Sequence, residues 1–407
     1  MVYDFDTLYP RRRIGASKWH HLTEALSQGN KDVFPFSVAD MDFKVAPEIQ
    51  EALHEAADFA IYGYYHPQPA YYEAVRAWQQ RRYGFSCRPE WIVQVPNIVY
   101  ALYQLVRTFT APGDAVIVQP PVYPPLFQAA EQQQRHLLVN PLIEGKQQYT
   151  MDLADLEVKA ADPRARMLIL CNPHNPVGRV WLESELLDVW RICRKRDILL
   201  VSDEIHADLV FQPHHHTVLA ALDQKITDRC IICTAPSKTF NLAGLTNANL
   251  MIPNENLRRR YQAAMRKTGI HGTNYFGTVA CQAAYEKGES WYQALLAYLA
   301  GNRALFAETM QQRIPQLRTF PIEGTYLGWI DMRALTLSGQ ERLALLQAAD
   351  LHFTAGEVFG REGAGFERIN LALPRQALQS GLDRLAEVVL DTGGLYQQEK
   401  KNRPGHA

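Results

Sequence analysis

The chain has almost no net charge, because its 42 lysine and arginine residues are balanced by 43 aspartate and glutamate residues. Proteins that bind nucleic acid or an anionic membrane surface usually carry a basic excess, so we expect neither kind of partner. The sequence also lacks an uninterrupted apolar run of membrane-spanning length, and its first residues lack the apolar core of a signal peptide. These absences predict a cytoplasmic protein.

Cysteine is scarce as well, with six residues in a chain of 407. A disulfide framework needs a denser set, so this scarcity indicates a reduced, intracellular protein. Cys230 and Cys233 have the spacing of a redox pair, but that chemistry needs a helix N-terminus, and this pair lies within an apolar stretch that predicts a strand. The sequence has no P-loop, zinc constellation or hydrolase nucleophile elbow. The three adjacent histidines at 214–216 cannot point to one metal centre and favour a solvated loop.

What the sequence does contain is a regular alternation of apolar strands and amphipathic helices. Hydrophobic residues make up 47% of the chain, enough for a large core. Apolar runs that predict buried strands lie at 115–118, 167–171, 198–203 and 230–233. Hydrophobic residues at helical spacing predict a helix at about 183–196, between the second and third runs. Repeated units of this kind favour an α/β fold with a largely parallel sheet that carries helices on both faces.

The pattern changes near residue 290, after which long helices alternate with short strands, such as one expected at 326–331. This change predicts a smaller C-terminal α/β domain that the N-terminal segment completes. The polar end of the chain predicts a flexible tail. The expected boundaries are 1–48 for the N-terminal segment, 49–288 for the large domain, 289–393 for the small domain and 394–407 for the tail.

Lys238 is the first candidate for chemistry. It lies in the segment Ala235–Gly244, into which the apolar run at 230–233 leads, and turn-prone residues follow it, so its amine is held at the end of a strand. A lysine in such a place can lose its proton by desolvation and attack an aldehyde, which is how pyridoxal 5'-phosphate (PLP) is bound as a Schiff base. A solvated charge is the ordinary alternative for a single lysine. Three further motifs favour the chemical interpretation.

The first of these motifs is Asp203, which ends the apolar run at 198–203. A carboxylate at the carboxyl end of a buried parallel strand can face the pyridine nitrogen of PLP and keep it protonated, so that the ring accepts electrons from a substrate carbanion. The alternative for an acid here is a helix cap, which is the expected role of the adjacent Glu204.

The other two motifs are turns after the runs at 167–171 and 115–118. In the first, two Asn-Pro steps and a glycine form a rigid turn that can aim the Asn175 amide at the ring hydroxyl of the cofactor. In the second, Tyr123 is fixed between prolines, which suits an aromatic lid over a flat ring. Tyr123 could also be an ordinary loop tyrosine.

These motifs, in this order, resemble those of the fold-type I, aspartate-aminotransferase-like superfamily of PLP enzymes. Within it the chain is most similar to the MalY/PatB-type cystathionine β-lyases, which are C–S lyases. The segments that carry the closer resemblance are Val38–Phe43, Ser202–Leu209, Pro236–Asn241, Gly363–Asn370 and Pro374–Arg375, so it covers nearly the whole chain. The resemblance implies a large domain with a mostly parallel seven-stranded sheet flanked by helices, plus a smaller α/β C-terminal domain.

The resemblance also implies roles for the residues already described. Lys238 would form the Schiff base and move the Cα proton, with Ser237 beside it at the cofactor. Asp203 would pair with the pyridine nitrogen, Asn175 with the ring oxygen, and Tyr123 would cover the ring.

Further residues enter through the resemblance alone. The segment from Pro96 resembles the start of the phosphate-binding helix, where the backbone N–H groups of Ile98 and Val99 can meet the phosphate. Tyr64 resembles the tyrosine that reaches the phosphate across a dimer interface. Arg368 matches the arginine that grips the substrate α-carboxylate, which its planar fork can do bidentately.

Two positions favour a lyase over a plain aminotransferase. Thr246 stands where many aminotransferases carry a phosphate-binding arginine, and His206, expected near the ring hydroxyl, stands where they commonly carry a tyrosine. Ser37 departs in the other direction, since lyases of this type often have tryptophan there.

The resemblance therefore implies a homodimeric PLP enzyme that cleaves L-cystathionine or a related S-substituted L-cysteine to a thiol, pyruvate and ammonia. Two alternatives stay open. One is an aminotransferase, which shares every step up to the Cα carbanion. The other is a PLP-bound regulatory protein that binds a transcription factor, since members of the family can have such roles; the sequence does not identify such a partner.

Overall fold

The computed structural model of the chain describes residues 3–20, 22, 33–270 and 274–402. The chain divides into two compact units. The small unit contains residues 1–43, 297–322 and 326–407, and the large unit contains residues 44–296 and 323–325. The boundaries therefore lie after Phe43 and Leu296, compared with residues 48 and 288 expected from the sequence.

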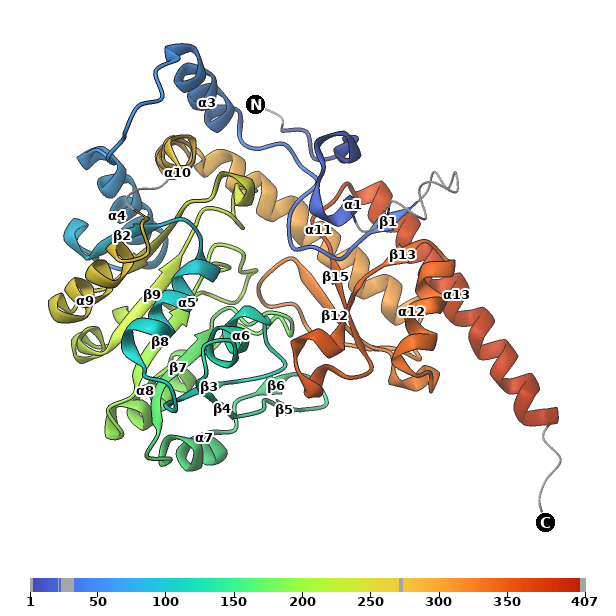
Figure 1. Ribbon diagram of the computed structural model, residues 1–407. Coiled ribbons are helices and arrows are strands. Elements are labelled where there is room, and N and C mark those ends of the chain that lie inside the picture. Colours follow the sequence, from blue (N-terminus) through green and yellow to red (C-terminus); the bar gives the residue numbers. More distant parts are fainter. Residues whose placement is uncertain (1–2, 21, 23–32, 271–273, 403–407) are drawn as a thin grey trace. The chain divides into compact units, whose positions relative to one another are not determined.

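A seven-stranded sheet forms the centre of the large unit (Figure 1). Its strands, in spatial order, are β2 (Ile92–Val95), β10 (Ala248–Met251), β9 (Cys230–Thr234), β8 (Leu199–Asp203), β7 (Ala165–Cys171), β3 (Ala115–Val118) and β4 (His136–Val139). Strand β10 is antiparallel to both of its neighbours, and the pairs from β9 to β4 are parallel. The mostly parallel seven-stranded sheet of an α/β protein is thus confirmed, and the four apolar runs form β3, β7, β8 and β9.

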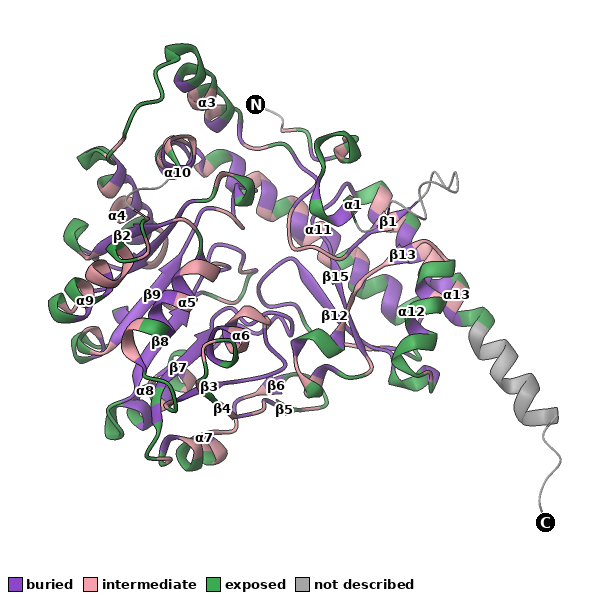
Figure 2. Ribbon diagram, in the orientation of Figure 1, coloured by how far each residue is buried: buried purple, intermediate pink, exposed green. Residues whose placement is uncertain are grey.

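Helices surround the sheet (Figure 1). The helices of the large unit are α3 (Pro47–Phe59), α4 (Pro69–Tyr83), α5 (Ile98–Phe109), α6 (Pro125–Glu131), α7 (Leu153–Ala160), α8 (Glu183–Lys195), α9 (Glu255–Arg266) and α10 (Tyr275–Lys287), and a hairpin joins β5 (Ile143–Glu144) and β6 (Tyr149–Thr150). Helix α5 buries Leu102, Leu105 and Val106 in one core with the sheet strands. Figure 2 shows buried strands and helices whose outer sides are exposed.

Helix α8 matches the helix expected at about 183–196. Its N-terminus is fixed by the Glu185 carboxylate, which accepts a hydrogen bond from the backbone N–H of Leu182 at 2.8 Å. Leu186, Trp190 and Cys193 are buried on the face toward the core, as helical spacing requires.

The small unit is built on a four-stranded antiparallel sheet. Its strands, in spatial order, are β11 (Arg318–Thr319), β12 (Leu327–Asp331), β15 (Phe366–Asn370) and β14 (Thr354–Ala355). A separate parallel pair joins β1 (Phe34–Pro35) to β13 (Leu351–His352), so the N-terminal segment pairs with the C-terminal part of the chain. The helices are α1 (Ser17–His20), α12 (Gly339–Ala348) and α13 (Arg375–Asn402), together with the second part of α11 (Glu289–Arg313), which begins in the large unit.

The C-terminal segment, expected to be a flexible tail, is helical over most of its length. Helix α13 continues to Asn402, so residues 394–402 of the segment expected to be flexible are helical. The remaining residues of that segment, 403–407, lie outside the described residues.

The cysteines are all buried, and none forms a disulfide. Cys230 and Cys233 both lie within β9 and not at a helix N-terminus, as the sequence predicts.

Candidate active site

Four chemically distinctive residues follow neighbouring strands of the large sheet. Tyr123 follows β3, Asn175 follows β7, Asp203 ends β8 and Lys238 follows β9, and these strands are adjacent in the order β9-β8-β7-β3. The strands are parallel, so their carboxyl ends meet at one edge of the sheet. Ligands of open α/β sheets bind at this edge.

Lys238 lies in a tight turn after β9. The backbone N–H of Phe240 donates to the carbonyl of Pro236 at 2.9 Å, and the N–H of Leu242 donates to the carbonyl of Ser237 at 3.1 Å. Each bond closes a loop of backbone that contains or adjoins Lys238, so the turn restricts where its side chain can start. Lys238 and Ser237 are both half-buried.

Asp203 is the buried acid of the site. It lies in register with Cys171 of β7 and Cys233 of β9, at the ends of three adjacent strands. Burial raises the pKa of Asp203 to about 7, against the opposing effects of a hydrogen bond from the Ile205 N–H and of the positive charge of Lys238. A carboxylate this desolvated is stabilised by a cationic partner.

Asn175 is held by the turn that follows β7. Its backbone N–H donates to the Cys171 sulfur at 3.4 Å, and its carbonyl accepts from the Tyr123 N–H at 3.1 Å. The ring of His174 contacts the Pro121 carbonyl through Nε2 at 2.9 Å. Burial lowers the pKa of His174 to about 4, so the neutral ring donates this bond. The turns that carry Asn175 and Tyr123 are therefore tied to each other.

The N-terminus of α5 provides donors for an anion. The Asn97 side chain caps the helix by accepting from the backbone N–H of Tyr100 at 2.8 Å. The N–H groups of Ile98 and Val99 begin the helix, where no carbonyl of the preceding turn is available to them. With the positive end of the helix dipole behind them, these two groups suit a phosphate, as the sequence predicts.

The other cofactor-binding residues expected from the sequence lie in the same unit. His206 is buried in the loop after β8, where its carbonyl accepts from the Leu209 N–H at 2.9 Å. Tyr64 is fully exposed between α3 and α4, with a relative accessibility of 110%. Thr246, which stands where many aminotransferases carry a phosphate-binding arginine, has a left-handed backbone conformation with φ of 46°.

Arg368 belongs to the small unit. It is buried on β15, between β12 and β14, where its guanidinium lies 5.0 Å from the ring centroid of Phe359. The guanidinium donates to the Ser37 carbonyl at 2.7 Å and to the Thr354 hydroxyl at 3.3 Å. The Thr354 hydroxyl donates in turn to the Ser37 carbonyl at 2.7 Å. Arg368 is thus fixed by a backbone carbonyl and a hydroxyl oxygen.

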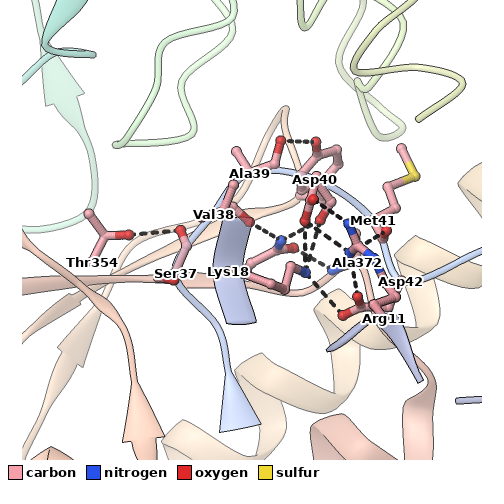
Figure 3. Close-up of polar contacts among 12 residues, drawn as sticks. Arg11, Lys18, Ser37, Val38, Ala39, Asp40, Met41, Asp42, Thr354 and Ala372 are labelled. Carbon is pink, nitrogen blue, oxygen red and sulfur yellow. Dashed lines mark hydrogen bonds and ion pairs between the residues drawn. The ribbon is translucent and has the colours of Figure 1, made fainter. Parts of the chain in front are cut away.

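An ionic cluster fixes the segment that follows Ser37 (Figure 3). Lys18, with 1% of its side chain exposed, lies 2.9 Å from the Asp40 carboxylate and 3.0 Å from the Asp42 carboxylate. Arg11 pairs with the same two acids at 2.5 Å. Burial alone would raise the pKa of Asp40, but hydrogen bonds and positive charge from Arg11 and Lys18 hold that pKa below its usual value. Asn370 adds bonds from its side-chain amide to the carbonyls of Val38 and Asp40, both at 2.6 Å.

Sequence reasoning missed two sets of residues, and for a third it was wrong: Glu204, expected to cap a helix, is buried and lies 2.8 Å from Nε2 of the buried His216, which was expected in a solvated loop. It did not find Arg11 and Lys18, because their acidic partners lie more than twenty residues further along the chain. It also assigned nothing to Asp208, although this acid lies within the Ser202–Leu209 segment that carries the resemblance. A buried carboxylate is costly unless it is hydrogen-bonded, so Asp208 would have stood out once its burial was known.

The large unit contains residues that suit each part of PLP, independently of any resemblance to known enzymes. The buried Asp203 carboxylate suits a protonated pyridine nitrogen, and the first N–H groups of α5 suit the phosphate. Lys238 offers an amine at the same edge of the sheet, within electrostatic range of Asp203. One acid, one amine and one anion site are what this cofactor requires.

The part of the chain that the structure describes contains neither a membrane-spanning helix nor a metal-binding cluster. Across 3–20, 22, 33–270 and 274–402, no helix is long and apolar enough to cross a bilayer. Within the same residues, no group of three or more histidine, cysteine, aspartate or glutamate side chains is placed to hold a metal ion.

Known proteins are similar to this chain over most of its length. The sequence pattern described as "Aminotransferase class I and II" matches residues 31–385. The chain is 38% identical to cystathionine beta-lyase PatB of Bacillus subtilis (strain 168), over 94% of this chain and 98% of that protein. It is 29% identical to protein MalY of Escherichia coli (strain K12), over 95% of this chain and 99% of that protein.

A solved structure shares the fold to the same extent. Cystalysin from Treponema denticola, which contains a pyridoxal 5'-phosphate cofactor, matches with a TM-score of 0.94 and 37% sequence identity. The match covers 96% of this chain and 100% of that chain. The chain therefore belongs to the class I and II aminotransferase family, in the branch of PLP-dependent enzymes that includes PatB and cystalysin.

Proposed function

We propose that the protein is a PLP-dependent carbon–sulfur β-lyase that cleaves L-cystathionine or a related S-substituted L-cysteine to a thiol, pyruvate and ammonia. The observation that carries the proposal is the alignment of Lys238, Asp203, Asn175 and Tyr123 at the ends of four adjacent strands. The similarity to cystathionine beta-lyase PatB supports the choice of a sulfur leaving group.

The chain's own residues would divide the work as follows. PLP, when bound, supplies an electron sink for negative charge that develops at the substrate Cα. Lys238 holds the cofactor between turnovers and takes the Cα proton during turnover. Asp203 keeps the pyridine nitrogen protonated, because the buried carboxylate and the ring N–H stabilise each other. The N–H groups of Ile98 and Val99 bind the phosphate.

Three other residues would orient the reacting groups. The Asn175 amide donates to the ring oxygen, and Tyr123 covers one face of the ring. Arg368 binds the α-carboxylate through two parallel N–H···O bonds, which fixes the direction of the Cα–H bond. Ser37 and Thr354 hold the guanidinium in place for this role.

The attachment of the cofactor can be tested directly. The purified protein should be yellow, and borohydride treatment followed by peptide mass mapping should place the cofactor on Lys238. A colourless protein that does not take up PLP, or a cofactor mapped to another lysine, would refute the proposed site.

The reaction type needs a separate experiment, because an aminotransferase shares the steps up to the Cα carbanion. The protein is incubated with cystathionine, with and without a keto acid, and pyruvate and free thiol are measured. A lyase releases both without the keto acid, faster than it transfers the amino group of alanine or aspartate. Thiol release that depends on the keto acid would instead support an aminotransferase.

We further propose that the enzyme acts as a homodimer. The end of α3 and the segment between α3 and α4 expose several large apolar side chains, which is unusual unless a partner covers them. The exposed residues are Phe59 at 68%, Ile61 at 70%, Tyr62 at 58% and Tyr64 at 110%. In the dimer, Tyr64 would reach the phosphate of the neighbouring subunit.

A further inference from the structure

We propose that Asp208 is a positioning residue for Lys238, which it holds in place through a hydrogen bond to the adjacent Thr239. The inference rests on the proposed role of Lys238 in binding PLP. It assigns a task to a buried acid that lies outside the set of proposed cofactor-binding residues.

Asp208 is the acceptor at the centre of a buried hydrogen-bond network. Its Oδ2 accepts from the Thr239 hydroxyl at 2.6 Å. Its Oδ1 accepts from the Trp78 indole N–H at 3.0 Å and also from the Tyr83 hydroxyl. Its backbone carbonyl accepts from the Tyr292 hydroxyl at 2.6 Å. Both carboxylate oxygens and the carbonyl of one buried residue are therefore satisfied by side chains from separate parts of the large unit.

The donors of this network cannot easily become acceptors. An indole N–H only donates. Burial and the charge of Asp208 raise the pKa of Tyr83 well above its usual value, and burial and the same charge raise that of Tyr292. Both hydroxyls therefore stay protonated. Trp78 and Tyr83 both donate to Oδ1, and Thr239 donates to Oδ2. The bond to Oδ2 fixes the direction of the Thr239 hydroxyl.

The network connects the two loops that carry the proposed acid and the proposed amine. Asp208 lies five residues after Asp203, within the turn closed by the bond from the Leu209 N–H to the His206 carbonyl at 2.9 Å. Thr239, with no exposed surface, follows Lys238 directly. The Asp208–Thr239 bond thus joins the loop of Asp203 to the loop of Lys238. Small errors in the position of a catalytic group reduce rates strongly, so this connection affects turnover as well as folding.

A pair of substitutions at Thr239 separates positioning from general packing. Thr239→Val removes the hydroxyl and keeps the shape, whereas Thr239→Ser keeps the hydroxyl and removes a methyl group. Thr110→Val is the matched control, because Thr110 is also a buried threonine of the large unit whose hydroxyl donates a 2.6 Å bond, to the Val106 carbonyl at the end of α5.

The first measurement uses the protein without PLP. Competitive acetylation with acetic anhydride, followed by mass spectrometry, gives the labelling rate of Lys238 relative to the other lysines. If Asp208 positions Lys238 through Thr239, loosening the turn should raise this relative rate about threefold or more in Thr239→Val. Thr239→Ser and Thr110→Val should label like the wild type. Equal labelling of Lys238 in Thr239→Val and Thr239→Ser would overturn the proposal.

The second measurement uses the PLP-loaded enzyme and cystathionine. Thr239→Val should lower kcat about tenfold with a smaller change in KM, and Thr239→Ser should restore most of the loss. A fall in the thermal midpoint that is equal in Thr239→Val and Thr110→Val, with kcat unchanged in both, would also overturn the proposal, since it would show a purely structural bond. If the wild type has no lyase activity, the proposed reaction fails, and the labelling experiment still decides whether Thr239 positions Lys238.

Discussion

Asp203 is a buried acid, and this makes the stability of the PLP-free protein depend on pH. Its folded-state pKa of about 7 lies above the value of an unfolded aspartate, so the folded chain retains a proton that the unfolded chain releases. The free energy of unfolding should therefore fall as pH rises from about 4 to about 7. The stabilisation that the retained proton gives the folded protein is complete below about pH 4 and is lost by about pH 7.

Asp203→Asn removes this titration. The variant should exceed the wild type in stability by up to about 4 kcal/mol above pH 7, and the gain should shrink toward pH 4. Urea unfolding of the PLP-free proteins at several pH values measures the difference. Asp188→Asn, at an exposed ion pair on α8, is the control and should leave the pH dependence unchanged. Parallel pH profiles for Asp203→Asn and the wild type would contradict the raised pKa.

Arg368 has a geometry that lysine cannot reproduce. Its guanidinium contacts the Ser37 carbonyl and the Thr354 hydroxyl while its planar fork remains suited to a carboxylate. Arg368→Lys should therefore raise KM and misplace the substrate Cα, at a cost of about 2–4 kcal/mol in kcat/KM. Steady-state kinetics with cystathionine measures the loss. Arg313→Lys, at an exposed pair with Asp383, should have no effect. Near-normal turnover in Arg368→Lys would mean that the α-carboxylate is bound elsewhere.

The segment from Ser37 to Asp42 of the small unit is in neither a helix nor a strand. Ion pairs to Lys18, and not the hydrogen bonds of a sheet, hold Asp40 and Asp42 in place. Lys18→Met would leave Asp40 and Asp42 with Arg11 as their remaining ionic partner in the cluster. Removing one side of a buried ion pair is costly, so the variant should lose about 3 kcal/mol of unfolding free energy at neutral pH.

The same variant has a defined pH dependence. The cluster holds the folded-state pKa of Asp40 below its unfolded value, so its stabilising contribution is present above about pH 4 and is lost as pH falls through the lower pKa. The difference between wild type and Lys18→Met should narrow in acid, as measured by urea unfolding. Lys195→Met, which removes an exposed pair with Glu157, is the control. A loss that stays constant down to low pH would show that Lys18 acts by packing alone.

The strands that the sequence predicted are those marked by a pattern of neighbouring residues, namely a short apolar run. Strands β3, β7, β8 and β9 are short apolar runs, and each candidate residue lies either at the last position of its strand or within five residues after it. The bonds of Asp208 to Trp78, Tyr83 and Thr239 join positions far apart in the chain. No spacing rule in one sequence reveals such a bond, because only folding brings the partners together. The ionic cluster of Arg11 and Lys18 was missed for the same reason.

For the whole molecule, the proposed dimer makes a prediction about Tyr64. If this exposed tyrosine binds the phosphate of a partner subunit, Tyr64→Phe should lose PLP faster on dialysis than the wild type. Tyr62→Phe is the control from the same segment, because the Tyr62 hydroxyl already donates to the Ala57 carbonyl at 2.7 Å within its own chain. Equal PLP retention in both variants would refute the assignment.

Mixed dimers show from which subunit Tyr64 acts. A dimer of one Tyr64→Phe chain and one Lys238→Ala chain contains one site with Lys238 and, if Tyr64 acts across the interface, an intact Tyr64 as well. Such a dimer should retain PLP at that site like the wild type. Retention at the level of Tyr64→Phe would show that Tyr64 serves its own chain.

The pairing of β1 with β13 has a consequence for how the protein is made. Phe34 and its partner Leu351 are roughly 300 residues apart, which a ribosome covers in roughly 15 to 60 seconds. The seven strands of the large sheet all lie between Ile92 and Met251, so they leave the ribosome well before Leu351 is added. The first strand to be synthesised is thus among the last to find its partner. Until Leu351 is added, Phe34 has no partner strand on the nascent chain, and an unpaired apolar strand of this kind is prone to aggregation during synthesis.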